Sequence, residues 1–340
     1  AYAVSFVMMV AAAAITQYYL PDRWLGDFRA ASNVTPGPIP VGVALSVSLL
    51  LLSLGYGWWR LSEALPTDKR PPLRVALIQG SLDTKFDQPF EQRVQMTFGQ
   101  YDPLTREAIQ KQPDTDLVVW PESMMVFAEF YAISDTQAND ESIAKDRRER
   151  LAALHQQFQI TQAELQRAMP NSYFLFGTTT LYFDLANELG MPSKNYNTAL
   201  LSSPPGTIAG RYYKMHPVMF GEFIPLADLF PFLHALTPLG PGMSIGERPE
   251  VFEVKGMRLA PNICFESTVP HLIREQVVRL ENQISQPIDA IVNVSNDGWF
   301  KGSSILDLHF RCSVFRAIEN RKPVIIAANT GISAHIDGNG

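Results

Sequence analysis

The run AIVNV (residues 290–294) is followed by a helical pattern over residues 304–320 and then by PVIIAA (residues 323–328). Both apolar runs have the length and composition of buried strands, and the segment between them has the spacing of a helix. A strand, a helix and a second strand in this order are typical of a layered α/β fold, in which helices cover a sheet. This stretch therefore predicts the fold class of the larger part of the chain.

The same alternation continues toward the amino terminus. Further strands are expected at residues 73–78, 117–120, 173–179 and 257–263. Helices are expected at residues 88–112 and 134–168, and in a segment that ends at Ile284. The charge run Asp146–Arg150 fits a solvated face of the second of these helices. The sequence thus predicts one α/β domain over residues 72–340.

The first 64 residues differ from the rest in charge. They hold six charged side chains, and the stretches 1–20 and 41–59 hold none. A helix of about 19 residues spans about 28 Å, close to the thickness of the hydrocarbon core of a bilayer. Aromatic residues at the ends of both stretches suit a membrane interface. We therefore predict a membrane region over residues 1–71 with two transmembrane helices, rather than two buried core helices or a secretory signal peptide.

The ends of the sequence and its loop charges bear on topology. The chain opens at Ala1 inside an apolar run and stops in the turn-like Asp337–Gly340, which predicts a fragment without its natural ends and a domain incomplete at its carboxyl end. Residues 60–74 carry more basic side chains than residues 21–40. The positive-inside rule weakens for long domains, so charge alone does not predict which side of the membrane the domain faces.

Composition excludes several classes of function. The net charge of −6, from 28 basic and 34 acidic residues, argues against nucleic-acid binding, which needs clustered Lys and Arg. Two cysteines cannot build a disulfide framework or a four-ligand zinc site. The six histidines lack metal-ligand spacing, and the sequence has no P-loop or Gly-x-Gly-x-x-Gly. We therefore expect no metal, no other cofactor and no nucleic-acid partner.

Polar residues follow three of the predicted strands. Glu122 ends Trp120-Pro121-Glu122, Cys264 follows Ile263, and Ser295–Asp297 follows Val294. The carboxyl ends of strands in α/β sheets share one crevice, so these side chains are candidates for a common site.

Cys264 is the candidate nucleophile of that site. It precedes a helix expected to start near Ser267–Pro270, and the amino end of a helix favours a thiolate. A thiol nucleophile needs a base and a donor for the developing oxyanion, and Glu122 and Lys214 are candidates for these roles. Cys312 lies within a helical pattern and is expected in the core.

In the order Glu122, Lys214 and Cys264, the sequence resembles the Glu-Lys-Cys triad of the nitrilase superfamily of carbon–nitrogen hydrolases. Within it, the chain is similar to the apolipoprotein N-acyltransferases, membrane enzymes that complete bacterial lipoprotein acylation. The matching words are WPE (120–122), GEFIP (221–225), ICFE (263–266), SNDGWF (295–300) and NTGIS (329–333). The resemblance covers about residues 72–340, and the two apolar helices resemble the family's last spans before its catalytic domain.

The resemblance implies an α/β fold, a four-layer α-β-β-α sandwich preceded by two transmembrane helices. It implies a multi-pass protein of the bacterial inner membrane whose catalytic domain faces the periplasm. Glu122 is then the general base, Cys264 the nucleophile that carries an acyl thioester, and Lys214 the stabiliser of the oxyanion. The implied reaction transfers a fatty acyl chain from a phospholipid to the N-terminal amine of a diacylglyceryl-modified apolipoprotein.

The resemblance also implies residues that support the triad. They are polar or aromatic and comprise Glu222, Glu266, Asn197, Phe265 and Trp299. Three positions depart from the family: Phe265 stands where Tyr is usual, Met219 replaces a Pro, and Gly298 replaces an Ala. The ionisable groups all remain, so the departures bear on rate and acceptor preference.

Apolar stretches flank the predicted site. Residues 223–240 carry a single charge, and residues 124–133 are similarly apolar. Flexible Met and Phe loops of this kind are suited to enter the edge of a bilayer and receive acyl chains, with core packing as the alternative. The residues expected to do so are Met124, Phe127, Phe223, Leu229 and Phe230.

Two other functions are consistent with the residues. A membrane-tethered amidase or nitrilase-type hydrolase would use the same triad with water in place of the amine. A scaffold that binds lipoproteins or lipid without catalysis would not need the triad, so the three intact side chains argue against it. We therefore predict an acyltransferase that works in two half-reactions through a thioester.

Overall fold

The computed structural model describes residues 2–19, 39–63, 70–83, 88–134, 137, 145–186, 191–226, 230, 232–233 and 242–340. The chain divides into two units, Ala1–Lys69 and Arg70–Gly340.

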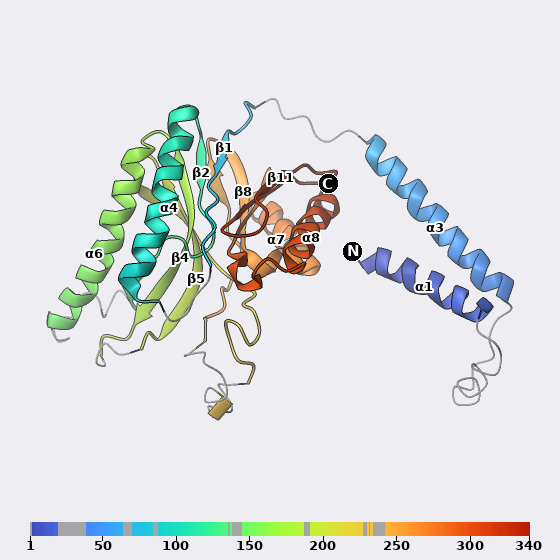
Figure 1. Cartoon of the computed structure of the whole chain (residues 1–340), viewed down its shortest axis with the longest axis horizontal. Coiled ribbons are helices and arrows are strands. Elements are labelled where there is room, and N and C mark those ends of the chain that lie inside the picture. Colours follow the sequence, from blue (N-terminus) through green and yellow to red (C-terminus); the bar gives the residue numbers. More distant parts are fainter. Residues whose placement is uncertain are drawn as a thin grey trace. The chain divides into compact units, whose positions relative to one another are not determined.

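The first unit contains the helices α1 (Tyr2–Tyr19) and α3 (Ile39–Ser62) (Figure 1). Over Val41–Ser62, α3 is long and apolar enough to cross a membrane. In α1, the described residues form a shorter apolar helix, Val4–Thr16. One of the two predicted spans thus has the length and composition of a transmembrane helix, and the span over residues 1–20 stays a prediction.

The first β-sheet of the second unit has six strands in the order β1-β2-β4-β5-β6, with β3 beside β4. These strands are β1 (Val75–Leu77), β2 (Leu117–Val119), β3 (Glu129–Ala132), β4 (Tyr173–Phe183), β5 (Lys194–Ser203) and β6 (Thr207–Tyr213). β1, β2 and β4 run parallel, whereas β4, β5 and β6 are antiparallel neighbours.

The second sheet has five strands in the order β11-β10-β9-β8-β7. They are β7 (Phe252–Val254), β8 (Met257–Ile263), β9 (Ala290–Ser295), β10 (Val324–Ala328) and β11 (Ala334–Ile336). The three central strands, β8, β9 and β10, are parallel, so their carboxyl ends lie at one edge of the sheet.

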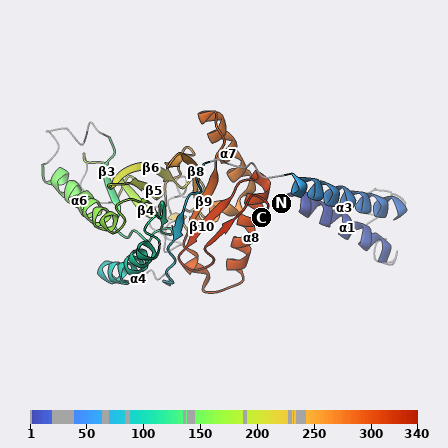
Figure 2. The same cartoon turned by 90° about the horizontal axis from the view of Figure 1, so that it is seen from above.

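Helices cover the outer faces of both sheets (Figures 1 and 2). The helices α4 (Phe90–Lys111) and α6 (Lys145–Ala168) lie on the first sheet, and α7 (Pro270–Ile284) and α8 (Ile305–Asn320) lie on the second. A shared apolar core lies between the sheets and includes Leu175 of β4 and Val292 of β9. The predicted four-layer α-β-β-α sandwich is therefore confirmed.

Helix α7 illustrates how the sequence produces this layering. Pro270 occupies its first turn, where a missing N–H costs nothing, and Ser285 ends it in the left-handed conformation. Ile273, Val277 and Leu280 recur at helical spacing and are buried against the sheet.

The predicted parallel strands and the four helices are present, but five strands were not predicted. They are β3, β5, β6, β7 and β11, and β4 extends beyond the predicted end at Thr179 to Phe183. Four of them, β5, β6, β7 and β11, pair antiparallel. β5 and β6 carry polar residues and tyrosines among their apolar residues, which hides the apolar run of a buried strand, and β7 and β11 are only three residues long. The predicted helix over 134–168 is observed from Lys145; residues 138–144 before it lie outside the described residues.

Candidate active site

Three strand ends carry the predicted catalytic residues. Glu122 follows β2, Lys214 follows β6, and Cys264 follows β8 as the first residue of the short 3₁₀ helix η2 (Cys264–Thr268). The three side chains are buried, with exposed fractions of 4% for Glu122, 1% for Lys214 and 8% for Cys264. Lys214 Nζ lies 3.3 Å from Glu122 Oε1. The charges of Glu122 and Lys214 both act on the Cys264 thiol, so all three groups belong to one site.

A second carboxylate completes the environment of the lysine. Lys214 Nζ donates a hydrogen bond of 2.8 Å to Glu222 Oε1. The amide of Asn197 donates to both carboxylates, at 2.6 Å to Glu122 and 3.1 Å to Glu222. Burial disfavours the ammonium, but the negative charges of Glu122 and Glu222 outweigh it and raise the pKa of Lys214. Lys214 is therefore a cation at neutral pH.

Backbone N–H groups hold the second oxygen of each carboxylate. Asn296 N donates to Glu122 Oε2 at 2.9 Å, and Val218 N donates to Glu222 Oε2 at 2.8 Å. Asn296 directly follows β9 of the second sheet, and Glu122 follows β2 of the first, so this bond links the ends of the two sheets at the site. Both oxygens of Glu122 are thus fixed in place.

The Cys264 thiol differs from the sequence-based expectation. Burial, followed by the charge of Glu122, raises the pKa of the thiol, and Lys214 and Ser295 offset this only in part. The prediction that the start of a helix favours the thiolate of Cys264 is therefore wrong. The reason is that η2 separates Cys264 from α7, which begins at Pro270, while the thiol is enclosed beside a carboxylate. The thiol is protonated at rest, so it needs a base during attack.

Glu266 hydrogen-bonds to the backbone on both sides of the site, next to Cys264 and next to Lys214. Its carboxylate accepts hydrogen bonds from the backbone N–H groups of Ile263 (2.7 Å), Met215 (2.7 Å) and His216 (3.0 Å). The Tyr212 hydroxyl donates to it at 2.9 Å. Burial raises the pKa of Glu266, and these hydrogen bonds oppose that rise. One buried side chain therefore ties the end of β6 to the end of β8.

A cavity of about 350 Å³ opens beside the two carboxylates. Its polar side includes Glu122, Asn197 and Glu222. Its apolar side is rich in methionine and includes Met96, Met124, Met125, Met243 and the ring of Trp299. The cavity thus offers a polar reaction end next to flexible apolar walls.

The residues expected to admit lipid are not all in one environment. Met124 is buried and lines the cavity. Phe127 packs in the core, with its ring 5.6 Å from Phe90 and 6.0 Å from Phe98. Phe223 is half-buried and Phe230 is exposed, whereas Leu229 lies outside the described residues.

The positions that depart from the family lie near the surface or in a turn. Phe265 is partly exposed and stacks on His216 with ring centroids 6.1 Å apart. Met219 is exposed, and Gly298 is buried in the 3₁₀ helix η3 (Asp297–Phe300). Cys312 is half-buried on α8 and, like Cys264, has a free thiol.

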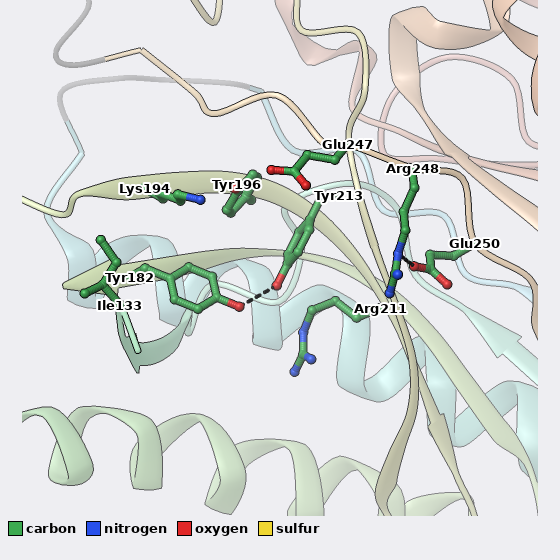
Figure 3. Close-up of a pocket in the computed structure, with 9 residues that line it drawn as sticks. All are labelled: Ile133, Tyr182, Lys194, Tyr196, Arg211, Tyr213, Glu247, Arg248 and Glu250. Carbon is green, nitrogen blue, oxygen red and sulfur yellow. Dashed lines mark hydrogen bonds and ion pairs between the residues drawn. The ribbon is translucent and has the colours of Figure 1, made fainter. Parts of the chain in front are cut away.

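A second cavity, of about 480 Å³, is shown in Figure 3. It lies on the outer face of the first sheet, away from Glu122 and Glu222. Tyr182, Tyr196, Tyr213 and Arg211 are among the residues that line it, and the Tyr182 and Tyr213 hydroxyls lie 2.8 Å apart. Successive residues of a strand point to opposite faces. Tyr213 therefore faces this outer cavity, whereas Lys214, the next residue, faces the carboxylates.

His309 was not predicted from the sequence as a site residue. This residue lies on α8, is buried, and contacts both Asp297 and the backbone of Cys264. Its position in mid-helix gives no sequence signal, because only the packing of α8 against η2 brings it to the site.

The chain is similar to known proteins that include a family of hydrolases and several apolipoprotein N-acyltransferases. Residues 74–340 match the carbon–nitrogen hydrolase family. The apolipoprotein N-acyltransferase of Geobacter metallireducens is 35% identical over 84% of this chain and 47% of its own length. The corresponding enzyme of Rhodopirellula baltica is 29% identical over 100% of this chain and 60% of its own length. The chain thus spans about half the length of these curated relatives.

Among solved structures, an amidase from Nesterenkonia sp. is similar with a TM-score of 0.47 and 15% sequence identity. The match covers 78% of this chain and 83% of the amidase.

Proposed function

Because the chain belongs to the carbon–nitrogen hydrolase family, we propose that Glu122, Lys214 and Cys264 are its catalytic residues and that it is part of an apolipoprotein N-acyltransferase. The reaction transfers a fatty acyl chain from a phospholipid to the N-terminal amine of a diacylglyceryl-modified apolipoprotein. The observation that carries the proposal is the buried Lys214 ammonium, which contacts two carboxylates beside a buried thiol.

The first half-reaction forms a thioester. Glu122 accepts the thiol proton while Cys264 Sγ attacks an ester carbonyl of the phospholipid. The C–O bond then breaks, and the leaving lysophospholipid oxygen takes the proton from Glu122. The acyl chain remains on Cys264 as a thioester. The raised pKa of the thiol supports this role of Glu122, because a protonated thiol cannot attack without a base.

Lys214 stabilises the oxyanion of each tetrahedral intermediate. Two of its three protons point to Glu122 and Glu222, and the third is left for the oxyanion. A fixed cation in a buried site acts strongly on developing charge and needs no reorganisation. A backbone N–H after Cys264 is a candidate for a second donor to the oxyanion.

The second half-reaction forms an amide. The free amine of the lipidated cysteine attacks the thioester, and Glu122 accepts the amine proton. When the C–S bond breaks, the proton returns to the sulfur and the thiol is regenerated. Transfer to an amine rather than to water is supported by the similarity to apolipoprotein N-acyltransferases, which extends over the whole chain in one relative.

An exposed apolar segment near Glu222 supports access to membrane lipid. Its large exposed side chains are Met219, Phe220, Leu226, Phe230 and Phe232. Exposed apolar surface of this kind marks contact with a membrane or a partner. We therefore assign this segment to the entry of acyl chains. We also propose that the protein is a multi-pass protein of the inner membrane with its catalytic domain in the periplasm.

Substitution of this segment tests the assignment to lipid entry. The double variant Phe220→Ser and Leu226→Ser is expected to slow turnover of phospholipid vesicles about tenfold while a short water-soluble thioester is processed at the normal rate. Ile160→Ser, an exposed apolar position on α6, is the matched control and leaves both rates unchanged. Equal losses on both donors would contradict the assignment.

Mass spectrometry tests the reaction itself. The whole protein in detergent is incubated with phospholipid and a diacylated lipopeptide, and the lipopeptide is expected to gain one fatty acyl group on its amine. A hydroxylamine-sensitive acyl adduct is expected on Cys264 and is lost in Cys264→Ala. Release of free fatty acid with an unchanged lipopeptide would instead identify a hydrolase.

A further inference from the structure

A buried histidine lies beneath the Cys264 turn. His309 of α8 has an exposed fraction of 8%. Its Nδ1 lies 2.9 Å from Asp297 Oδ1, and its Nε2 lies 3.1 Å from the Cys264 carbonyl oxygen and 2.9 Å from Ser267 Oγ. His309, Asp297 and Ser267 have no role in the proposed reaction.

The partners of the ring define its charge. Nδ1 of His309 faces the Asp297 carboxylate, which only accepts. Nε2 faces the Cys264 carbonyl, which also only accepts, and the Ser267 hydroxyl, whose single proton is donated to that same carbonyl. An imidazolium satisfies both contacts, whereas a neutral ring leaves one nitrogen facing an acceptor. Burial opposes the charge, but Asp297 outweighs it and raises the pKa of His309.

The same network reaches the thiol by a second route. Ser295 Oγ donates to Asp297 Oδ1 at 2.8 Å. Both residues also act on the pKa of the Cys264 thiol, which Asp297 raises and Ser295 lowers. His309 therefore contacts the backbone of Cys264 directly and acts on its thiol through Asp297.

The backbone at Cys264 needs such support. Its φ of 51° lies in the left-handed region, which is strained for a residue with a side chain. Its carbonyl oxygen accepts from Asn293 Nδ2 (3.1 Å) and Ser267 Oγ (3.2 Å) in addition to His309. Three donors on one carbonyl hold the turn in the conformation that aims the thiol at Glu122 and Lys214.

We propose that the buried Asp297–His309 ion pair is a positioning device that fixes the strained turn at Cys264 and offsets the Asp297 charge next to the thiol. His309 acts through Cys264 and touches no substrate. The inference rests on the proposed role of Cys264 as the nucleophile, but its main consequence, an altered thiol, is measurable without any substrate.

The test compares His309→Ala with the wild-type protein in two assays. Iodoacetamide labels the thiols, and peptide mapping follows Cys264 and Cys312 in the same sample. Loss of His309 leaves the Asp297 charge uncompensated beside the thiol, so we expect alkylation of Cys264 to slow about tenfold while Cys312 is unaffected. Formation of the acyl adduct from phospholipid is expected to slow about 100-fold, because the misplaced thiol also loses its alignment.

Two further variants separate positioning from folding. Ser313→Ala removes another buried polar side chain from α8 and is expected to behave as the wild type in both assays. His309→Gln keeps a donor for the Cys264 carbonyl but no charge, so its rate of acyl transfer is expected between those of the wild type and His309→Ala. If His309→Ala does not fold, His309→Gln carries the test.

The outcomes are distinct. Folded His309 variants that alkylate and acylate within about twofold of the wild type would overturn the inference. If the wild type itself forms no acyl adduct, the proposed function fails, while the alkylation of Cys264 still decides whether His309 positions the thiol.

Discussion

Lys214 Nζ lies closer to Glu222 (2.8 Å) than to the predicted base Glu122 (3.3 Å). The cation is thus shared, and its shorter contact is to the carboxylate that the proposed reaction does not protonate. Glu222 therefore takes a share of the Lys214 charge and helps to fix the position of its ammonium beside Glu122.

This relationship predicts the effect of Glu222→Gln. With Glu222 neutral, Lys214 loses the charge of its shorter contact, so its ammonium is held less firmly in the position where it stabilises the oxyanion. We expect kcat to fall about tenfold to 100-fold, with little change in the KM for the lipopeptide. Steady-state kinetics with varied lipopeptide measures both. A rise in KM at constant kcat would indicate that Glu222 binds substrate instead.

Glu122→Gln is expected to separate thiol reactivity from catalysis. The charge of Glu122 raises the pKa of Cys264, so its removal lowers that pKa and increases the thiolate fraction at any given pH. Alkylation of Cys264 by iodoacetamide at pH 8 should therefore accelerate, whereas acyl transfer should fall by about 100-fold or more because the base is missing.

Lys214→Met provides the opposite control, since loss of the cation raises the pKa of Cys264 further and slows alkylation. Slower alkylation in Glu122→Gln would show that the carboxylate does not govern the thiol.

The sequence predicted the strands that carry two of the three proposed catalytic residues. Glu122 follows the short, continuous apolar run Leu117–Trp120, which is typical of a buried parallel strand, and the structure has β2 there. Cys264 follows β8, which was also predicted although Arg258 and Asn262 interrupt its apolar residues. Lys214 was a weak candidate from its local residues alone, because β6 (TIAGRYY) has neither a continuous apolar run nor a regular alternation and was not predicted as a strand. The family resemblance, rather than periodicity, pointed to it.

Contacts between segments that are far apart in the chain could not be predicted from the sequence. His309 lies 45 residues from Cys264, and only the packing of α8 on η2 joins them. The pKa of Cys264 was predicted in the wrong direction for the same reason. A helix start is visible in sequence, but the burial of the thiol beside a carboxylate from the other sheet is a property of the assembled sandwich.

Glu266→Gln is expected to destabilise the domain. A glutamine oxygen cannot accept the three backbone N–H bonds that the buried carboxylate accepts. Breaking a buried charged network of this kind costs about 3 kcal/mol. Tyr212→Phe, which removes one donor of the same network, is expected to cost about 1 kcal/mol.

Thermal unfolding of the whole protein in detergent compares the two variants. Equal melting temperatures for Glu266→Gln and the wild type would rule out a structural role for this carboxylate.

Asp289 is expected to contribute stability that depends on pH. Burial opposes its ionisation, but hydrogen bonds from Arg70 and Arg258 outweigh this and lower its pKa. A lowered carboxyl pKa stabilises the folded state above the unfolded value of about 3.9, and this contribution disappears as the pH falls through the folded value. Asp289→Asn should therefore lower the free energy of unfolding at pH 7 by about 1 kcal/mol, a value that allows for solvent screening.

Melting temperatures at pH 7 and pH 3 check this prediction. The gap between Asp289→Asn and the wild type should shrink at pH 3. Glu107→Gln, in an exposed pair with Lys111, is the control and should leave the melting temperature unchanged at both values. A gap that is the same at both pH values would show that Asp289 acts by packing alone.

The cavity lined by tyrosines and the cluster of carboxylates lie on opposite faces of the same two strands, β5 and β6. Tyr196 and Asn197 are consecutive in β5, and Tyr213 and Lys214 are consecutive at the end of β6, so each pair joins the two compartments through a single peptide unit. A bulkier or smaller side chain in this cavity would shift those strands and, with them, the amide and the ammonium on the other side. We therefore expect substitutions at Tyr196 or Tyr213 to alter turnover, although both side chains lie on the face of the sheet away from Glu122 and Glu222.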